Sequence, residues 1–158
     1  MKQIEEKFMD RAVELSRLGM KNKKGGPFGC VIVRDGKIIG EGNNEVLISS
    51  DPTAHAEVVA IRNACKTINH FQLDGCDIYC SCEPCPMCFG AIYWARPARV
   101  IYANTKEDAA YIDFDDSFIY EEIKTEHSKK LIPFIRMHSE KALDVFREWK
   151  QMDEKQVY

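Results

Sequence analysis

The sequence predicts an α/β fold, in which helices and strands alternate along the chain. Two observations carry this prediction. Apolar residues recur at helical spacing from Ile4 to Leu18, and short apolar, β-branched runs alternate with further helical patterns after them. The chain has 158 residues, 45% hydrophobic and 30% charged, which is typical of one globular domain. We therefore expect one α/β domain over residues 1–158.

The first half of the chain is expected to form a helix, a β-hairpin and a second helix. The first helix covers residues 3–19 and ends at Gly19. Asp35-Gly36 lies between two apolar runs, so residues 28–33 and 37–42 are expected to pair as a hairpin. Asp51-Pro52-Thr53 is typical of a helix start, with Asp51 as the cap, and that helix is expected to run to Ala64.

The second half is expected to alternate between strands and helices. Residues 77–80 and 99–103 have the composition of buried strands, and a helix over 85–95 separates them. Residues 104–130 are expected to be irregular and acidic, with a short helix near 116–122. A last strand is expected over 131–137, and a final helix is expected to follow with Ser139 as its cap.

Two short motifs carry the chemistry: His55-Ala56-Glu57 and Pro84-Cys85-Pro86-Met87-Cys88. One imidazole and two thiolates are three zinc ligands, and a catalytic zinc keeps its fourth position for water. Glu57 lies two residues from the histidine, close enough to move protons on that water. A C-x-x-C pair alone also fits a redox pair or a structural zinc site. The two motifs together favour a catalytic zinc held by His55, Cys85 and Cys88, with Glu57 as the proton carrier.

The spacing of these residues sets a geometric condition. Two helical residues two positions apart point about 200° away from each other. His55 and Glu57 therefore reach one point only if the helix directs its N-terminal end at the metal. Cys85 and Cys88 share one face of the next helix. We expect two helix N-termini to converge on the metal, where their partial positive charge favours thiolates.

Composition excludes some classes of function. The net charge is −3, and phosphate contacts need clustered Lys and Arg, so we expect no nucleic-acid partner. No apolar stretch has membrane-spanning length, and the first residues lack the pattern of a signal peptide. Seven cysteines without an export signal favour reduced thiols and metal ligation over disulfides. We therefore expect a cytoplasmic protein with no membrane partner.

Residues 25–102 resemble the cytidine-deaminase superfamily of zinc nucleobase deaminases. The matching segments are Gly26-Pro27-Phe28-Gly29, Gly42-Asn43-Asn44, residues 51–57 and residues 83–88. The resemblance implies a three-layer α/β/α fold with a central mixed sheet of about five strands flanked by helices. It also implies one Zn²⁺ per active site, with water or hydroxide as the fourth ligand.

Further segments resemble the bacterial guanine deaminases: Tyr93-Trp94-Ala95-Arg96-Pro97, residues 114–120 and the terminal Tyr158. This resemblance implies hydrolysis of guanine to xanthine and ammonia. Its substrate-binding residues would be Phe28, stacked on the purine, Asn44, Ala56, Asp116 and Tyr158, with Asp116 also catalytic. It further implies a homodimer that exchanges its C-terminal segment, about residues 105–158, so that Asp116 and Tyr158 reach the partner's zinc.

Hydrogen-bond chemistry supports guanine independently. The N1–H group and the exocyclic amine of guanine are donors, and a carboxylate such as Asp116 only accepts. Other amino-substituted substrates remain open, namely guanosine, cytosine or adenosine in tRNA. A non-enzymatic alternative is a scaffold module stabilised by zinc, in which Glu57 would be dispensable.

Overall fold

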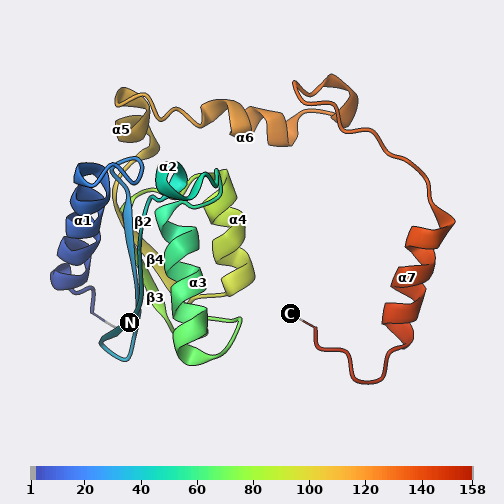
Figure 1. Ribbon diagram of the computed structural model, residues 1–158, viewed down its shortest axis with the longest axis horizontal. Helices are drawn as coiled ribbons and strands as arrows, with labels where there is room; N and C mark the ends of the chain where they lie inside the picture. The colour runs from blue at the N-terminus through green and yellow to red at the C-terminus, as the bar shows by residue number, and fades with distance from the viewer. Residues whose placement is uncertain (1–2, 158) are drawn as a thin grey trace. The chain divides into compact units, whose positions relative to one another are not determined.

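The computed structural model describes residues 3–157, and a mixed sheet forms its centre (Figure 1). The strands are β1 (Gly29–Arg34), β2 (Lys37–Asn43), β3 (Asp77–Cys82) and β4 (Arg99–Asn104), in the order β2-β1-β3-β4. β1 is antiparallel to both β2 and β3, whereas β3 and β4 are parallel. Within the described residues the sheet thus has four strands, one fewer than expected.

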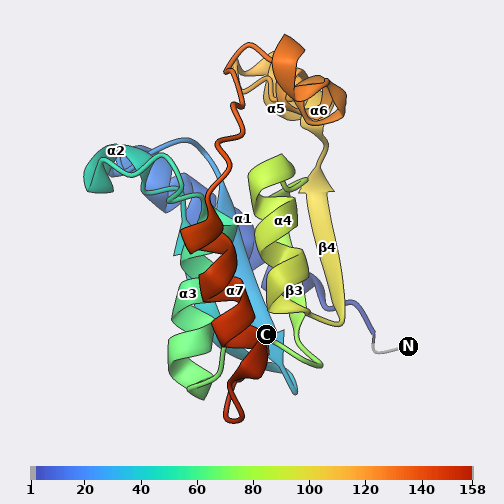
Figure 2. The same ribbon diagram turned by 90° about the vertical axis from the view of Figure 1, so that its right-hand side faces the viewer.

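Helices cover both faces of the sheet, which confirms the three-layer α/β/α prediction. α1 (Glu6–Lys21) covers one face, where Phe8, Ala12 and Leu15 pack against Val31, Val33 and Tyr79. α3 (Ala56–Ile68) and α4 (Pro86–Ala95) cover the opposite face (Figure 2). The core on that side joins α3 and α4 to β1 and β3 through Ala56, Ala60, Ala64, Ile92, Cys30, Ile32, Ile78 and Cys80.

A glycine in β2 lets α3 approach the sheet closely. A Cβ atom on Gly42 would lie 2.3 Å from the Ala56 carbonyl oxygen and 2.7 Å from the Ala60 nitrogen. Both of these atoms belong to the helix backbone, so no larger residue fits there without moving the helix. The contact holds the first turn of α3 against the end of β2, next to Asn44.

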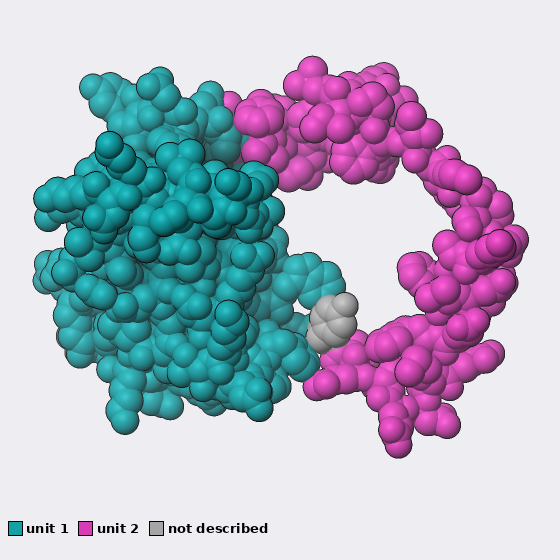
Figure 3. Space-filling view, viewed as in Figure 1, with its two compact units in different colours: residues 1–116 teal, residues 117–158 magenta. Residues whose placement is uncertain are grey.

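Contacts divide the chain into two compact units, residues 1–116 and 117–158 (Figure 3). The first unit holds the sheet and also the short helices α2 (Val46–Ser49) and α5 (Lys106–Tyr111). The second holds α6 (Ser117–Lys124), the 3₁₀ turn η1 (His127–Lys129) and α7 (Glu140–Gln151). None of these three described elements of the second unit contains a buried residue. In the part of the chain described, no helix is both long and apolar enough for a bilayer span.

Two expectations for the C-terminal third were wrong. α5 forms where irregular chain was expected, stabilised by a capping box between Thr105 and Asp108. Residues 131–137 form no strand, and their large apolar side chains are exposed because no strand among the described residues pairs with them. The final helix is confirmed, with the Ser139 hydroxyl accepting the Ala142 N–H at 3.3 Å.

Candidate metal centre and active site

His55 lies at the N-terminal end of α3. The helix begins at Ala56, later than the sequence indicated, and His55 is its N-cap. Asp51 does not cap the helix: its carboxylate accepts the Thr53 N–H at 2.8 Å and closes a turn before it. The later start places the histidine at the tip of the helix and Glu57 in its first turn, as the geometric condition requires.

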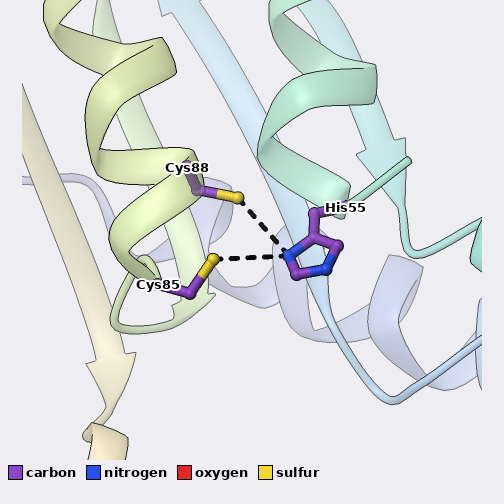
Figure 4. A group of neighbouring side chains, drawn as sticks. All are labelled: His55, Cys85 and Cys88. Carbon is purple, nitrogen blue, oxygen red and sulfur yellow. Dashed lines mark hydrogen bonds between the residues drawn. The ribbon is translucent and has the colours of Figure 1, made fainter. Parts of the chain in front are cut away.

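Cys85 and Cys88 lie at the N-terminal end of α4. Cys85 is the N-cap, Pro86 takes the first helical position, where its missing N–H costs nothing, and Cys88 follows in the same turn. Figure 4 shows both sulfur atoms directed at the Nδ1 atom of His55. Two helix N-termini therefore converge on one point, as expected from the spacing.

The donor set fits a tetrahedral zinc ion. His55 Nδ1 lies 3.5 Å from Cys85 Sγ and 3.5 Å from Cys88 Sγ. With Zn–S near 2.3 Å and Zn–N near 2.05 Å, a nitrogen and a sulfur on one tetrahedral zinc lie about 3.6 Å apart. Among the described residues, the cluster of candidate ligands has these three members, with all ligand atoms within 4.8 Å of one another. The set is thus that of a site with one position left for water.

Hydrogen bonds within the ligand cluster shift the pKa values of both cysteines. The hydrogen bond from Cys88, followed by that from His55, lowers the pKa of Cys85 to about 4. The same hydrogen bond raises the pKa of Cys88, which keeps the shared proton. The Cys85 thiolate in turn raises the pKa of His55. These opposite shifts favour one thiolate and one shared proton in the pair, and binding of a cation would displace that proton.

Glu57 faces the same point. Its side chain is only 8% exposed. Burial raises the pKa of Glu57, and the negative charge of Cys85 adds to this effect. The charge of His55 acts in the opposite direction and lowers the pKa of Glu57. The acid therefore lies beside the metal site in an environment that favours holding a proton, which suits a group that must accept and release one.

Phe28 and Asn44 are brought together, and Phe28 packs against the core that contains Ala56. The Asn44 N–H donates to the Phe28 carbonyl at 3.0 Å, so the two residues are held by one backbone hydrogen bond. The Asn44 side chain is 4% exposed, and its Oδ1 atom accepts the Val46 N–H at 3.2 Å. This bond fixes the orientation of the amide. Ala56 is buried at the start of α3.

Phe114 contacts Phe28, and no sequence pattern predicted this contact. Its ring meets that of Phe28 edge-on, with centroids 5.0 Å apart and an interplanar angle of 89°. The pair requires Gly26, because a Cβ atom there would lie 2.8 Å from Phe114 and 2.9 Å from Phe28. The Gly26-Pro27-Phe28 motif hinted at tight packing, but nothing local to residue 114 indicated its partner.

Asp116 belongs to the first unit, together with the zinc ligands of the same chain. Its side chain is half-buried, whereas Asp113 and Asp115 are exposed. Burial raises the pKa of Asp116, and the charge of Cys85 raises it further. Whether Asp116 serves its own chain or a partner's zinc stays a prediction. Tyr158, the other expected pocket residue, lies outside the described residues.

Comparison with known proteins identifies the family. Residues 2–104 match the family described as the cytidine and deoxycytidylate deaminase zinc-binding region. The chain belongs to this deaminase family. His55, Cys85 and Cys88, which this structure positions for a metal ion, are thus the zinc site of a deaminase.

Within the deaminase family, the similarities differ in extent. The chain is 54% identical to a guanine deaminase of Bacillus subtilis over 153 residues, covering 97% of this chain and 98% of that one. The crystal structure of B. subtilis guanine deaminase matches with a TM-score of 0.95, covering 99% of both chains at 52% identity. A tRNA-specific adenosine deaminase of Aquifex aeolicus is 44% identical, but over only 49% of this chain and 51% of its own.

Proposed function

We propose that this protein is a zinc-dependent guanine deaminase, which hydrolyses guanine to xanthine and ammonia. The observation that carries the proposal is the extent of the similarity. The family match ends at residue 104, and the similarity to the A. aeolicus tRNA deaminase spans about half of the chain. The similarity to the B. subtilis guanine deaminase continues through the C-terminal third. This third contains Phe114 and Asp116.

The reaction needs a nucleophilic water and two proton transfers. His55, Cys85 and Cys88 would hold the zinc ion, which when bound would lower the pKa of a water molecule and so make it a nucleophile. We assign the proton transfers to Glu57, which takes a proton from the attacking water and gives it to the ring nitrogen beside the reacting carbon. Glu57 then carries the second proton of that water to the leaving amine, so ammonia departs and a carbonyl remains.

Purine recognition is assigned to residues from three segments. Phe28 stacks on the purine ring, since its own ring is held edge-on by Phe114. Asn44 offers an amide whose orientation is fixed by Val46. Asp116 accepts from the N1–H and amine groups of guanine, for which a carboxylate is suited. A pocket with this acceptor rejects bases that present a ring acceptor at the same place, because two acceptors would then face each other unpaired.

A nucleic-acid substrate is disfavoured by charge. A deaminase that acts on tRNA must hold a flipped base and its flanking phosphates. The net charge of this chain is −3, which offers little attraction to a phosphate backbone. We also propose a cytoplasmic location, because all seven cysteines are free and a zinc–thiolate site persists best where thiols stay reduced.

We further propose a homodimer that exchanges residues 117–158. The support is an imbalance between composition and burial. The second unit carries large apolar side chains that are mostly exposed, including Leu131, Ile132, Phe134, Ile135 and Phe146, all at least 59% exposed. A segment of this length cannot form a stable core alone. The first unit exposes its own apolar residues on α4, where Phe89, Tyr93 and Trp94 are at least 55% exposed.

Exposed apolar surfaces of this size on both units need a partner, and we take that partner to be a second copy of the chain. Because Asp116 lies in the first unit, the exchanged segment starts after it, later than the residue 105 expected from the sequence. Exchange would then add Tyr158 of one subunit to the site of the other and complete one domain from two chains.

Ammonia release tests the proposed activity. Purified zinc-loaded protein is offered guanine, guanosine, adenine, cytosine and a tRNA anticodon stem-loop in parallel. We expect guanine to react at least about a hundredfold faster than the others, as hydrogen-bond mismatches of buried groups allow. Chelation of zinc is expected to stop the reaction, and added zinc to restore it. Reaction of the stem-loop with guanine inert would overturn the assignment.

A further inference from the structure

The segment that carries Asp116 is fastened to the loop that carries the zinc ligands. This segment, residues 105–116, leaves the end of β4 and contains α5. At its start the Glu83 N–H donates to the Asn104 carbonyl at 2.8 Å. The Glu83 carboxylate then accepts the N–H of Lys106 at 3.2 Å. Glu83 is thus hydrogen-bonded to the last residue of β4 and to the first residue of α5, on either side of Thr105.

The second of these bonds involves an N–H group in the first turn of α5. The first N–H groups of a helix lack partners inside the helix. Thr105 and Asp108 satisfy each other in the capping box, at 2.8 Å from Thr105 N to Asp108 Oδ2 and 3.3 Å from Asp108 N to Thr105 Oγ1. The Lys106 N–H lies between them, and the acceptor the structure gives it is Glu83, from the other side of the loop.

The far end of the segment is held separately. Phe114 meets Phe28 edge-on, and its N–H donates to the Ala109 carbonyl at 3.0 Å, which folds the chain back onto α5. Asp116 follows two residues later. The start of the segment is held by Glu83 and by Cys82, whose Sγ donates to the Thr105 carbonyl at 3.5 Å, and the far end is held at Phe28. Loss of the Glu83 carboxylate would remove the bond to the Lys106 N–H, so the first turn of α5 would be held less firmly.

We propose that Glu83 is a positioning residue, which fixes the start of the 105–116 segment so that Asp116 meets the substrate. The proposal rests on the proposed function only in that Asp116 is taken as a substrate-binding residue. Glu83 is two residues from Cys85, and its described hydrogen bonds go to Asn104 and Lys106. Glu83 therefore affects the position of Asp116 through α5, and its carboxylate does not position the zinc ligands.

Three variants test this, each assayed for zinc content, turnover and hydrogen exchange. Glu83→Ala removes the acceptor and is expected to lower kcat/KM about tenfold, the size of one lost hydrogen bond to a charged group. Amides of residues 106–111 should then exchange at least about tenfold faster, with zinc content unchanged. Glu83→Gln keeps an acceptor oxygen and should stay within about threefold of the parent. Glu107→Ala, an exposed acid on the same segment, is the matched control.

A double variant separates positioning from a general structural role. If Glu83 acts through Asp116, Glu83→Ala should cost nothing further in an Asp116→Ala background, because the group it positions is already gone. An equal loss in both backgrounds, loss of zinc from Glu83→Ala, or unchanged amide exchange would each overturn the proposal. If Asp116→Ala turns over too slowly to measure, the amide hydrogen exchange of residues 106–111 decides whether the proposal stands.

Amide hydrogen exchange also tests the role of Glu83 independently of the proposed function. Faster exchange in Glu83→Ala with a parent protein that is inert to guanine would refute the function and leave the attachment standing. Unchanged exchange in a parent protein that deaminates guanine would refute the attachment alone.

Discussion

At the scale of single residues, Glu57 is the strongest test of chemistry. Its carboxyl group is buried beside the ligand cluster, and a glutamine has nearly the same shape but cannot accept and release a proton. We expect Glu57→Gln to lower kcat by a factor of about 10²–10⁴, the usual contribution of a general acid–base group. Zinc content, measured by atomic emission, and the melting temperature should change little.

The control for this variant is Glu107→Gln, which makes the same substitution on an exposed acid of α5. It should leave both turnover and zinc content at the parent level. If Glu57→Gln kept full turnover, Glu57 would not be the proton carrier. Only a parent protein that releases ammonia from none of the bases would favour the scaffold alternative.

The relative directions of site residues that lie close together in the sequence could be predicted from their spacing. His55 with Glu57, and Cys85 with Cys88, lie within one helical turn, so spacing alone fixed their relative directions. Phe114 could not be found in this way, because its contact with Phe28 joins residues far apart in the chain and depends on how α5 packs. Asp116 was identified through family resemblance, which also implies that it reaches the partner's zinc; the description of a single chain leaves that part a prediction.

At the scale of elements, the approach of α3 to β2 positions the metal site and rests on Gly42. A Cβ atom at this position would lie 2.3 Å from the Ala56 carbonyl oxygen, which belongs to backbone that has no freedom to rotate away. Gly42→Ala must therefore displace the first turn of α3. We expect it to destabilise the protein by about 1–3 kcal/mol, as overpacking does, and to weaken zinc retention. Urea unfolding and zinc content after dialysis measure the two effects.

Gly90 in α4 provides the matched comparison. A Cβ atom there meets nothing within 4 Å among the described residues. Gly90→Ala should stabilise the protein by about 0.5–1 kcal/mol, because alanine loses less conformational freedom than glycine when it enters a helix. Equal effects of the two substitutions would show that α3 does not rest on β2 as closely as the structure indicates.

The elements that sequence patterns missed depend on tertiary partners. The hairpin and the strands at β3 and β4 were predicted because turn residues and apolar runs are local signals. Residues 131–137 carry the same kind of apolar run but form no strand, since a strand needs a neighbour and none of residues 3–157 pairs with them. α5 was missed although Thr105 and Asp108 have the spacing of a capping box.

At the scale of the whole molecule, subunit exchange can be tested by complementation. We expect Asp116 to serve its own chain's site, and exchange of residues 117–158 to deliver Tyr158 to the partner's. A mixed dimer of Glu57→Gln and Tyr158→Ala chains would then hold one site with both groups intact. Random reassembly makes half of the dimers mixed, so about a quarter of the parent activity should return. Each variant alone should be at least about tenfold less active than the parent.

The companion mixture distinguishes exchange from a general effect of mixing chains. Glu57→Gln with Asp116→Ala should recover nothing, because both groups act within one chain and every site of a mixed dimer lacks one of them. Native mass spectrometry confirms that mixed dimers form in both cases. Recovery with both Asp116→Ala and Tyr158→Ala would place the crossover before residue 116. Recovery with neither, despite mixed dimers, would mean that each chain closes its own site and that the apolar surfaces of the two units are covered without exchange.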